Sequence, residues 1–143
     1  MSRFAPNAQY LKTAVETATP TRRLLMLYDG AIRFLGQALP AMRARDYEAQ
    51  SRFIGKAQDI IVYLRATLDF EAGGAVARQL EAVYTPMYDM LTDANIHDRP
   101  EKIEKVIEFL RELREAWVEV DRQCQMGKSA GRDPGAKSEL VAA

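Results

Sequence analysis

Apolar residues are densest from Leu24 to Leu35, where they recur at helical spacing but occupy three stripes instead of one. A helix on the surface of a globular protein needs a single apolar face. This segment is therefore expected either to lie in the middle of a helical bundle or to share an extra apolar face with a partner. The stripes consist of Leu24, Tyr28, Ala31 and Leu35; of Leu25, Ile32 and Leu39; and of Leu27, Phe34 and Ala38.

Three later segments show the same helical spacing of apolar residues. The last of them has one clean stripe, which runs from Ile103 to Cys124 opposite a charged face, so we expect this helix at the side of the bundle with no face to share. No segment alternates in the way typical of a half-buried strand. The pattern predicts helices over residues 20–45, 47–68, 75–94 and 100–126.

Residues that begin or break helices flank these segments. Thr19 followed by Pro20 is typical of a helix start, and Asp46 is expected to cap the second helix. The pair Gly73-Gly74 is expected to break the chain before the third helix, and Asn95 to end that helix in a left-handed conformation. Pro40 predicts a kink or an early end in the first helix.

The predicted elements indicate an all-α fold, an antiparallel up-and-down four-helix bundle. Residues 1–126 are expected to form one domain. Within it, residues 1–19 are expected to be a short segment that packs on the bundle and can leave it. Residues 127–143 are rich in Gly, Ser, Lys, Pro and Ala and are expected to be a disordered tail.

Composition narrows the class of protein further. Twenty basic residues balance twenty acidic ones, which argues against a nucleic-acid binder that works through bulk charge. Cys124 is the only cysteine, so no internal disulfide can form, and it is expected to be a small buried apolar residue. No apolar run approaches the roughly 18 residues of a membrane span, and no secretory signal is evident. We expect a cytoplasmic protein that does not insert into membranes.

The sequence lacks the residue patterns of common catalytic and metal sites. Di-iron bundles need Glu-x-x-His pairs, but His97 is the only histidine and falls between two predicted helices. Phosphate-binding glycine loops and nucleophile motifs are missing as well. We therefore expect no metal, no cofactor and no enzymatic activity. A phosphorelay role for His97 is the weaker alternative to an exposed loop residue.

The stretch L-M-L-Y-D-G-A-I-R-F-L, from Leu25 to Leu35, resembles the first-helix signature of the flagellin export chaperones of the FliS type. Further similar segments follow in the family's order, and Pro86 stands where an aromatic residue is usual. These segments are Thr17–Pro20, Ala57–Ile61, Thr67–Glu71 with Gly73-Gly74, Leu80–Asn95 in part, and Leu110–Trp117.

The resemblance implies a cytoplasmic chaperone whose client is flagellin. Members of the family bind the disordered C-terminal segment of flagellin, prevent premature polymerisation and help to present the subunit to the flagellar type III export gate. The client lies partly as helices in apolar grooves of the bundle. The N-terminal segment of the chaperone can lie over part of that surface when no client is bound.

Taken with the surplus apolar faces of the first two helices, the resemblance suggests where a client would bind. Tyr10 and Leu11 are candidates for the displaceable N-terminal cover. Tyr28 and Asp29 are either client contacts or groups bonded inside the bundle. The remaining candidate groove residues, some of which are expected to be plain core, are Leu24, Leu27, Ile32, Ile54, Ala57, Ile61 and Leu64.

An alternative interpretation uses the same apolar faces differently. They would bury against a second copy of the chain, which would then be a self-associating structural or interaction protein with no flagellin client. Under the chaperone hypothesis we expect a monomer or a weak homodimer when no client is bound.

Overall fold

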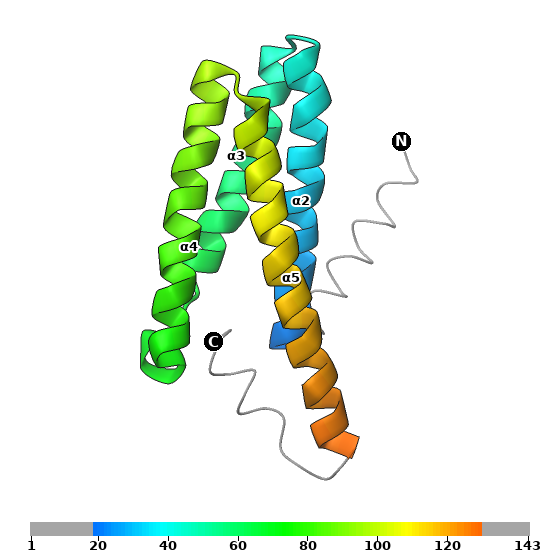
Figure 1. Cartoon of the computed structure of the whole chain (residues 1–143), viewed down its shortest axis with the longest axis vertical. Coiled ribbons are helices and arrows are strands. Elements are labelled where there is room, and N and C mark those ends of the chain that lie inside the picture. Colours follow the sequence, from blue (N-terminus) through cyan, green and yellow to red (C-terminus); the bar gives the residue numbers. More distant parts are fainter. Residues whose placement is uncertain (1–18, 130–143) are drawn as a thin grey trace, which may run out of the picture.

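The structure, a computed structural model, describes residues 19–129, apart from the side chains of Cys124, Lys128 and Ser129. Its helices are α2 (Pro20–Arg43), α3 (Tyr47–Ala66), α4 (Phe70–His97) and α5 (Pro100–Ser129). Short turns join them into an antiparallel up-and-down bundle (Figure 1), which confirms the predicted fold class. The described part of the chain does not include Tyr10, Leu11 or the side chain of Cys124, so the predictions for these residues fall outside it.

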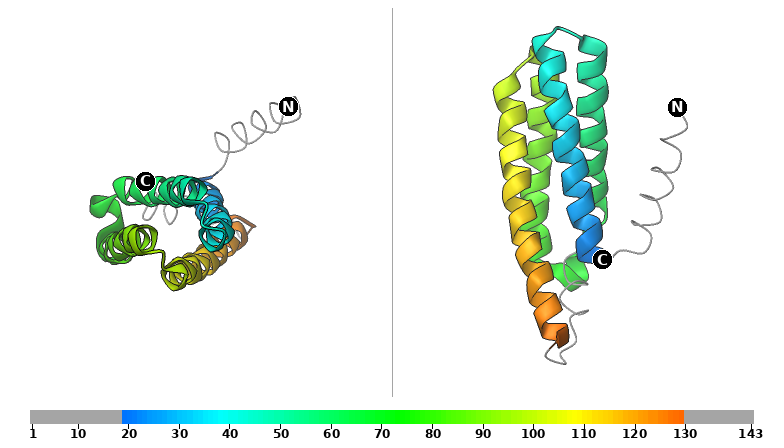
Figure 2. Two further views of the ribbon diagram at one scale, coloured as in Figure 1. Left: turned by 90° about the horizontal axis from the view of Figure 1, so that it is seen from above. Right: turned by 90° about the vertical axis from the view of Figure 1, so that its right-hand side faces the viewer.

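The four helices form a ring in which each contacts two neighbours. Viewed along the bundle, α2 lies beside α3 and α5, and α4 also lies between α3 and α5 (Figure 2). The pairs α2 with α4 and α3 with α5 are therefore diagonal. Helices α4 and α5 are close at the turn that joins them and lie further apart towards the N-terminal end of α4 (Figure 1).

Side-chain caps begin three of the helices, at the two predicted positions Thr19 and Asp46 and also at Asp69. The Thr19 hydroxyl accepts a hydrogen bond from the Arg22 N–H at 3.2 Å, and Asp46 accepts one from the Ala49 N–H at 3.2 Å. Asp69 accepts one from the Ala72 N–H at 2.9 Å. Each bond satisfies a backbone donor that the first helical turn leaves without a partner. The predicted starts at Pro20 and Tyr47 are thus confirmed.

The boundaries of α4 differ from the prediction at both ends. The helix starts at Phe70 because Asp69 caps it, and the break at Gly74 (φ +51°, ψ −124°) falls inside it. The prediction that Asn95 ends the helix was wrong. Asn95 stays helical, where its side chain and carbonyl accept hydrogen bonds from Gln50, and the left-handed cap is Asp98 (φ 52°).

Three other helix ends also differ from the prediction, and the first is that of α3, which ends at Ala66 instead of residue 68. Helix α2 continues through Pro40 to Arg43, and α5 continues to Ser129, so residues 127–129 of the predicted tail are helical. Residues 130–143 of that tail lie outside the described chain.

The core fills the centre of the ring and takes residues from every helix. The extra stripes of α2 pack against this core and are partly buried, so its neighbours α3 and α5 use the apolar surface that looked surplus in the sequence. The buried set includes Leu35 and Met42 of α2, Ile54 and Ile61 of α3, Met87 and Leu91 of α4, and Ile103, Val106 and Leu110 of α5.

Candidate partner-binding site

Most of the predicted groove residues on α2 and α3 lie inside the core. Leu27 and Ile32 are half-buried and pack against the core. A client could not touch the fully buried ones in this arrangement, and as client contacts these residues stay a prediction. The buried ones are Leu24, Tyr28, Ile54, Ala57, Ile61 and Leu64.

Tyr28 belongs to a buried hydrogen-bonded group that joins three helices. Its hydroxyl lies 2.5 Å from the Tyr84 hydroxyl of α4, and it accepts a hydrogen bond from Trp117 Nε1 of α5 at 2.9 Å. Burial raises the pKa of both tyrosines because a buried phenolate would lose its hydration. Of the two alternatives for Tyr28, the structure has the tyrosine bonded inside the bundle.

Asp29 and Gly30 each serve a helix contact. Asp29 accepts a hydrogen bond from Arg114 Nε of α5 at 2.5 Å, and this ion pair raises the pKa of Arg114. The pair is exposed to solvent, so it contributes at most about 1 kcal/mol. Gly30 faces α3, where an added Cβ would lie 3.4 Å from Ile60 Cδ1. The close approach of α2 to α3 at this point is consistent with a glycine, but it leaves room for a methyl group.

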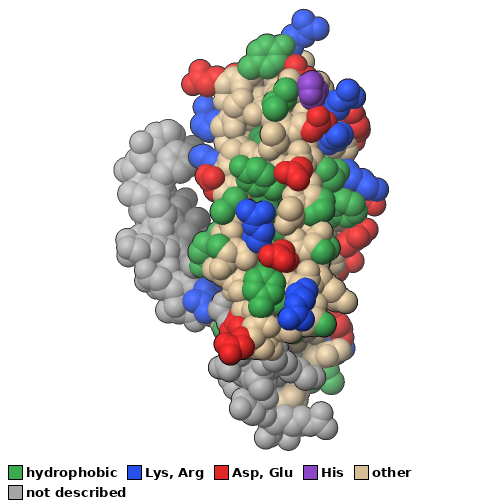
Figure 3. All heavy atoms as spheres, turned by 90° about the vertical axis from the view of Figure 1, so that its left-hand side faces the viewer, with side chains coloured by type: hydrophobic (Ala, Val, Ile, Leu, Met, Phe, Trp, Pro, Cys, Tyr) green, Lys and Arg blue, Asp and Glu red, His purple; other side chains and the backbone are tan. Residues whose placement is uncertain are grey.

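A hollow of about 470 Å³ opens between α4 and α5. Its walls are apolar apart from one carboxylate, that of Glu112. Figure 3 shows hydrophobic side chains along α4 and, at the right of the view, along its seam with α5. The lining residues are Ala82, Val83, Pro86 and Met87 of α4, and Phe109, Glu112 and Leu113 of α5.

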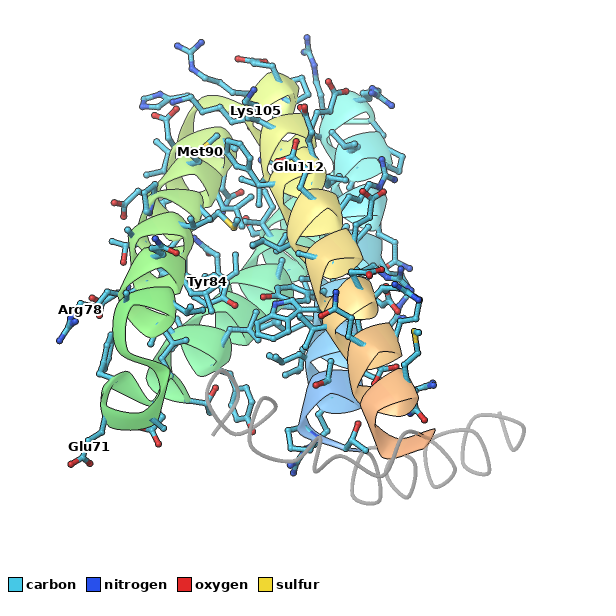
Figure 4. All side chains as sticks on the ribbon, turned by 60° about the horizontal axis from the view of Figure 1, so that its bottom comes forward. Glu71, Arg78, Tyr84, Met90, Lys105 and Glu112 are labelled. Carbon is cyan, nitrogen blue, oxygen red and sulfur yellow. The ribbon has the colours of Figure 1, made fainter. Side chains whose placement is uncertain are left out.

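The hollow has a charged side chain near each end of its α5 wall. Lys105 Nζ lies 5.3 Å from the centre of the Phe109 ring, a distance at which a cation is attracted to the aromatic face. Glu112 makes no hydrogen bond or ion pair within residues 19–129. Figure 4 shows Lys105 and Glu112 on α5, with Met90 of α4 beside the seam.

Sequence reasoning missed this hollow because it assigned α5 a single stripe. Phe109 lies outside that stripe, yet Phe109, Leu113 and Val120 are all partly buried against the core. Leu113 and Val120 belong to the predicted stripe, and Phe109 stands four residues before Leu113 at the edge of that stripe, which was the available signal. The hollow adds apolar surface to α5 beside that stripe, and the prediction that α5 has no face to share stays a prediction.

Comparison with known proteins assigns the family. The family model described as "Flagellar protein FliS" matches residues 3–124. The chain belongs to the FliS family. The flagellar secretion chaperone FliS of Vibrio cholerae is 36% identical over 115 residues, which cover 78% of this chain and 85% of the relative.

Similar FliS relatives are found in other bacteria. The flagellar secretion chaperone FliS of Campylobacter jejuni is 35% identical over 111 residues, covering 78% of this chain and 87% of the relative. The FliS of Bacillus subtilis is 33% identical over 112 residues, covering 78% and 83%. The resemblance found in the sequence is confirmed, and the chain is a member of a chaperone family of flagellum biogenesis and protein export.

The described part of the chain contains neither a metal-binding cluster nor a helix that could span a membrane. Within residues 19–129, no group of three or more His, Cys, Asp or Glu side chains is placed to hold a metal ion. None of the helices in that part of the chain has the length and apolar content needed to cross a membrane.

Proposed function

We propose that this protein is a cytoplasmic chaperone that binds the disordered C-terminal segment of flagellin, prevents its premature polymerisation and helps to deliver it to the flagellar type III export gate. It acts by binding and carries out no catalysis. The observation that carries the proposal is the apolar hollow between α4 and α5 in a member of the FliS family.

The physical requirement for such a chaperone is exposed apolar surface. A disordered segment that folds on binding loses conformational entropy, which burial of its apolar side chains must offset. Each large apolar side chain that is fully buried contributes about 1.5–3 kcal/mol. The lining of Val83, Pro86, Phe109 and Leu113 supplies partner atoms for an amphipathic client helix.

The seam between α4 and α5 extends the binding surface beyond the hollow. Val76 is 47% exposed and Val83 is 37% exposed on α4, and Met90 is partly buried on the same helix. A client helix that follows this seam would cover side chains that now contact water. Leu27 and Ile32 on α2, and Tyr10 and Leu11 in the N-terminal segment, remain candidates for further contacts and for the displaceable cover.

Titration of the full chain with the C-terminal segment of flagellin from the same organism tests the proposal. We expect saturable binding in isothermal titration calorimetry, with a negative heat-capacity change that reports apolar burial. Absence of saturable binding at micromolar concentrations would contradict it. Light scattering at several concentrations tests the alternative, since a dimer that persists with and without the client would favour self-association.

A further inference from the structure

We propose that the seam between α4 and α5 accepts a client helix in one direction, which Lys105 and Glu112 set by pairing with an acidic and a basic side chain of the client. This inference rests on the proposed function. It adds the charge pattern of the segment that the hollow recognises and the polarity with which that segment lies.

The first observation is the isolation of the two charges. Glu112 is the single ionisable residue that lines the hollow, and its carboxylate has no partner among the described residues. Lys105 contacts the Phe109 ring and forms no ion pair in residues 19–129. Most charges near the turn between α4 and α5 are paired instead, as Lys102 and Arg99 are with Asp93. Both Lys105 and Glu112 are thus free to meet charges of a partner.

The second observation is their spacing. Lys105 and Glu112 are seven residues apart on α5, so they lie on the same side of the helix and about 10.5 Å apart along its axis. The same interval separates two residues of a client helix that are seven positions apart. A client helix with an acidic residue followed seven positions later by a basic residue would match both charges only when it runs parallel to α5. A client helix whose basic residue comes first and whose acidic residue follows seven positions later would match both charges only when it runs antiparallel to α5.

Surroundings of low polarity make the pairing selective. An apolar wall excludes water from one side of Glu112 when a client covers the hollow, so a client that places an apolar or acidic residue there leaves a carboxylate without a partner. Apolar contacts select a direction through shape alone, whereas the two charges of opposite sign distinguish the two directions directly. The direction is therefore decided by the two charges.

The test uses a synthetic helical peptide with apolar residues at positions i, i+3, i+4 and i+7, a Glu near its N-terminus and a Lys seven residues later. A spin label at the peptide N-terminus broadens nearby methyl resonances of the full chain. Met90 marks the Lys105 end of the seam, and Val76 marks the other end, about 21 Å away along α4. With the natural chain we expect broadening of Met90 and little of Val76.

The double variant Lys105→Glu with Glu112→Lys should reverse this pattern, so that Val76 is broadened. The matched control reverses one charge of each sign away from the seam, Arg52→Glu with Asp59→Lys, which are exposed and seven residues apart on α3, and it should keep the natural pattern. Thermal melts of both variants check that the bundle is folded. A peptide that fails to bind, broadening of both ends, or the same broadened end in every protein would overturn the inference.

The natural client gives an independent measurement. Replacement Glu112→Gln should weaken binding of the flagellin C-terminal segment about two- to fivefold, the range of partly exposed ion pairs. The control Asp59→Asn, at an exposed position of α3 away from the seam, should leave the affinity unchanged. Equal affinity for the natural chain and Glu112→Gln would overturn the inference while leaving the proposed function standing. Complete absence of flagellin binding would refute the proposed function itself.

Discussion

The hydroxyl groups of Tyr28 and Tyr84 lie 2.5 Å apart in the middle of the bundle, although α2 and α4 are diagonal helices whose backbones do not come into contact. Trp117 donates to Tyr28 from a third helix. Apolar packing alone tolerates small shifts of one helix along another, whereas these bonds are satisfied at one relative position of α2, α4 and α5.

Replacement Tyr28→Phe should lower the free energy of unfolding by about 1–3 kcal/mol, because it leaves the Trp117 N–H and the Tyr84 hydroxyl buried without that partner. Urea unfolding measures the loss. Tyr63→Phe is the control, since Tyr63 is 55% exposed and should change little. Equal stability of Tyr28→Phe and the natural chain would show that the buried bonds contribute nothing.

The same pair predicts how stability depends on alkaline pH. Burial raises the pKa of Tyr28 and Tyr84 above the ordinary value of 10.0, so above that pH the folded chain holds protons that the unfolded chain has released. Their contribution is complete below pH 10 and is lost as pH rises. The free energy of unfolding should fall by up to about 1.4 kcal/mol per pH unit for each tyrosine. The slope should be shallower in the double variant Tyr28→Phe with Tyr84→Phe.

Replacement Gly30→Ala should be neutral or stabilise the fold by up to about 1 kcal/mol. The added methyl group would meet the end of the Ile60 side chain at 3.4 Å, and alanine is the better helix former. Thermal unfolding measures the change. Gly74→Ala should instead destabilise, because Gly74 has a φ of +51° that disfavours other residues. A large loss at Gly30 would mean that α2 and α3 cannot separate by the few tenths of an ångström needed.

Replacement Val83→Asp should weaken binding of the flagellin segment by about tenfold or more, because it places a carboxylate in the wall of the hollow. Calorimetric titration measures the affinity. Val118→Asp is a matched control on α5, since Val118 is 40% exposed, close to the 37% of Val83, and does not line the hollow. Equal losses in the two variants would place the client elsewhere.

Deletion of residues 1–15 should change the affinity for the flagellin segment and leave a cooperative thermal melt. The reason is the expectation that Tyr10 and Leu11 belong to a cover that the client displaces, and not to the core. Circular dichroism follows the melt and calorimetry the affinity. Loss of the cooperative transition would show instead that the bundle depends on the N-terminal segment.

The sequence predicted those parts of the fold that depend on local rules. Thr19 and Asp46 cap helices because a side-chain oxygen next to a helix start accepts from its first turn wherever the helix lies. Asn95 shows where local rules fail. It remains helical, and it accepts hydrogen bonds from Gln50 of α3, a contact between helices that no local pattern contains.

The candidate site was harder to predict than the fold. Periodicity identified Leu24, Ile54 and Ile61 as apolar faces, but a buried core stripe and a client groove have the same spacing. Whether an apolar stripe is covered or stays open depends on the distances between neighbouring helices. These distances, such as that between α4 and α5, are a property of the whole ring. Spacing alone shows Phe109 at the edge of an apolar stripe, but the fact that Phe109 and Val83 line one hollow was recognisable only once both helices were placed in space.

The chain contains a single tryptophan, and its place gives the protein an intrinsic optical reporter. Trp117 is 5% exposed, donates to Tyr28, and lies one helical turn beyond Leu113 in the wall of the hollow. Its emission wavelength depends on contact with water, so solvent entry on unfolding shifts it to the red. The same fluorescence needs no added label and should also respond to changes in packing near the hollow. Unfolding and client binding can therefore be measured in the same sample.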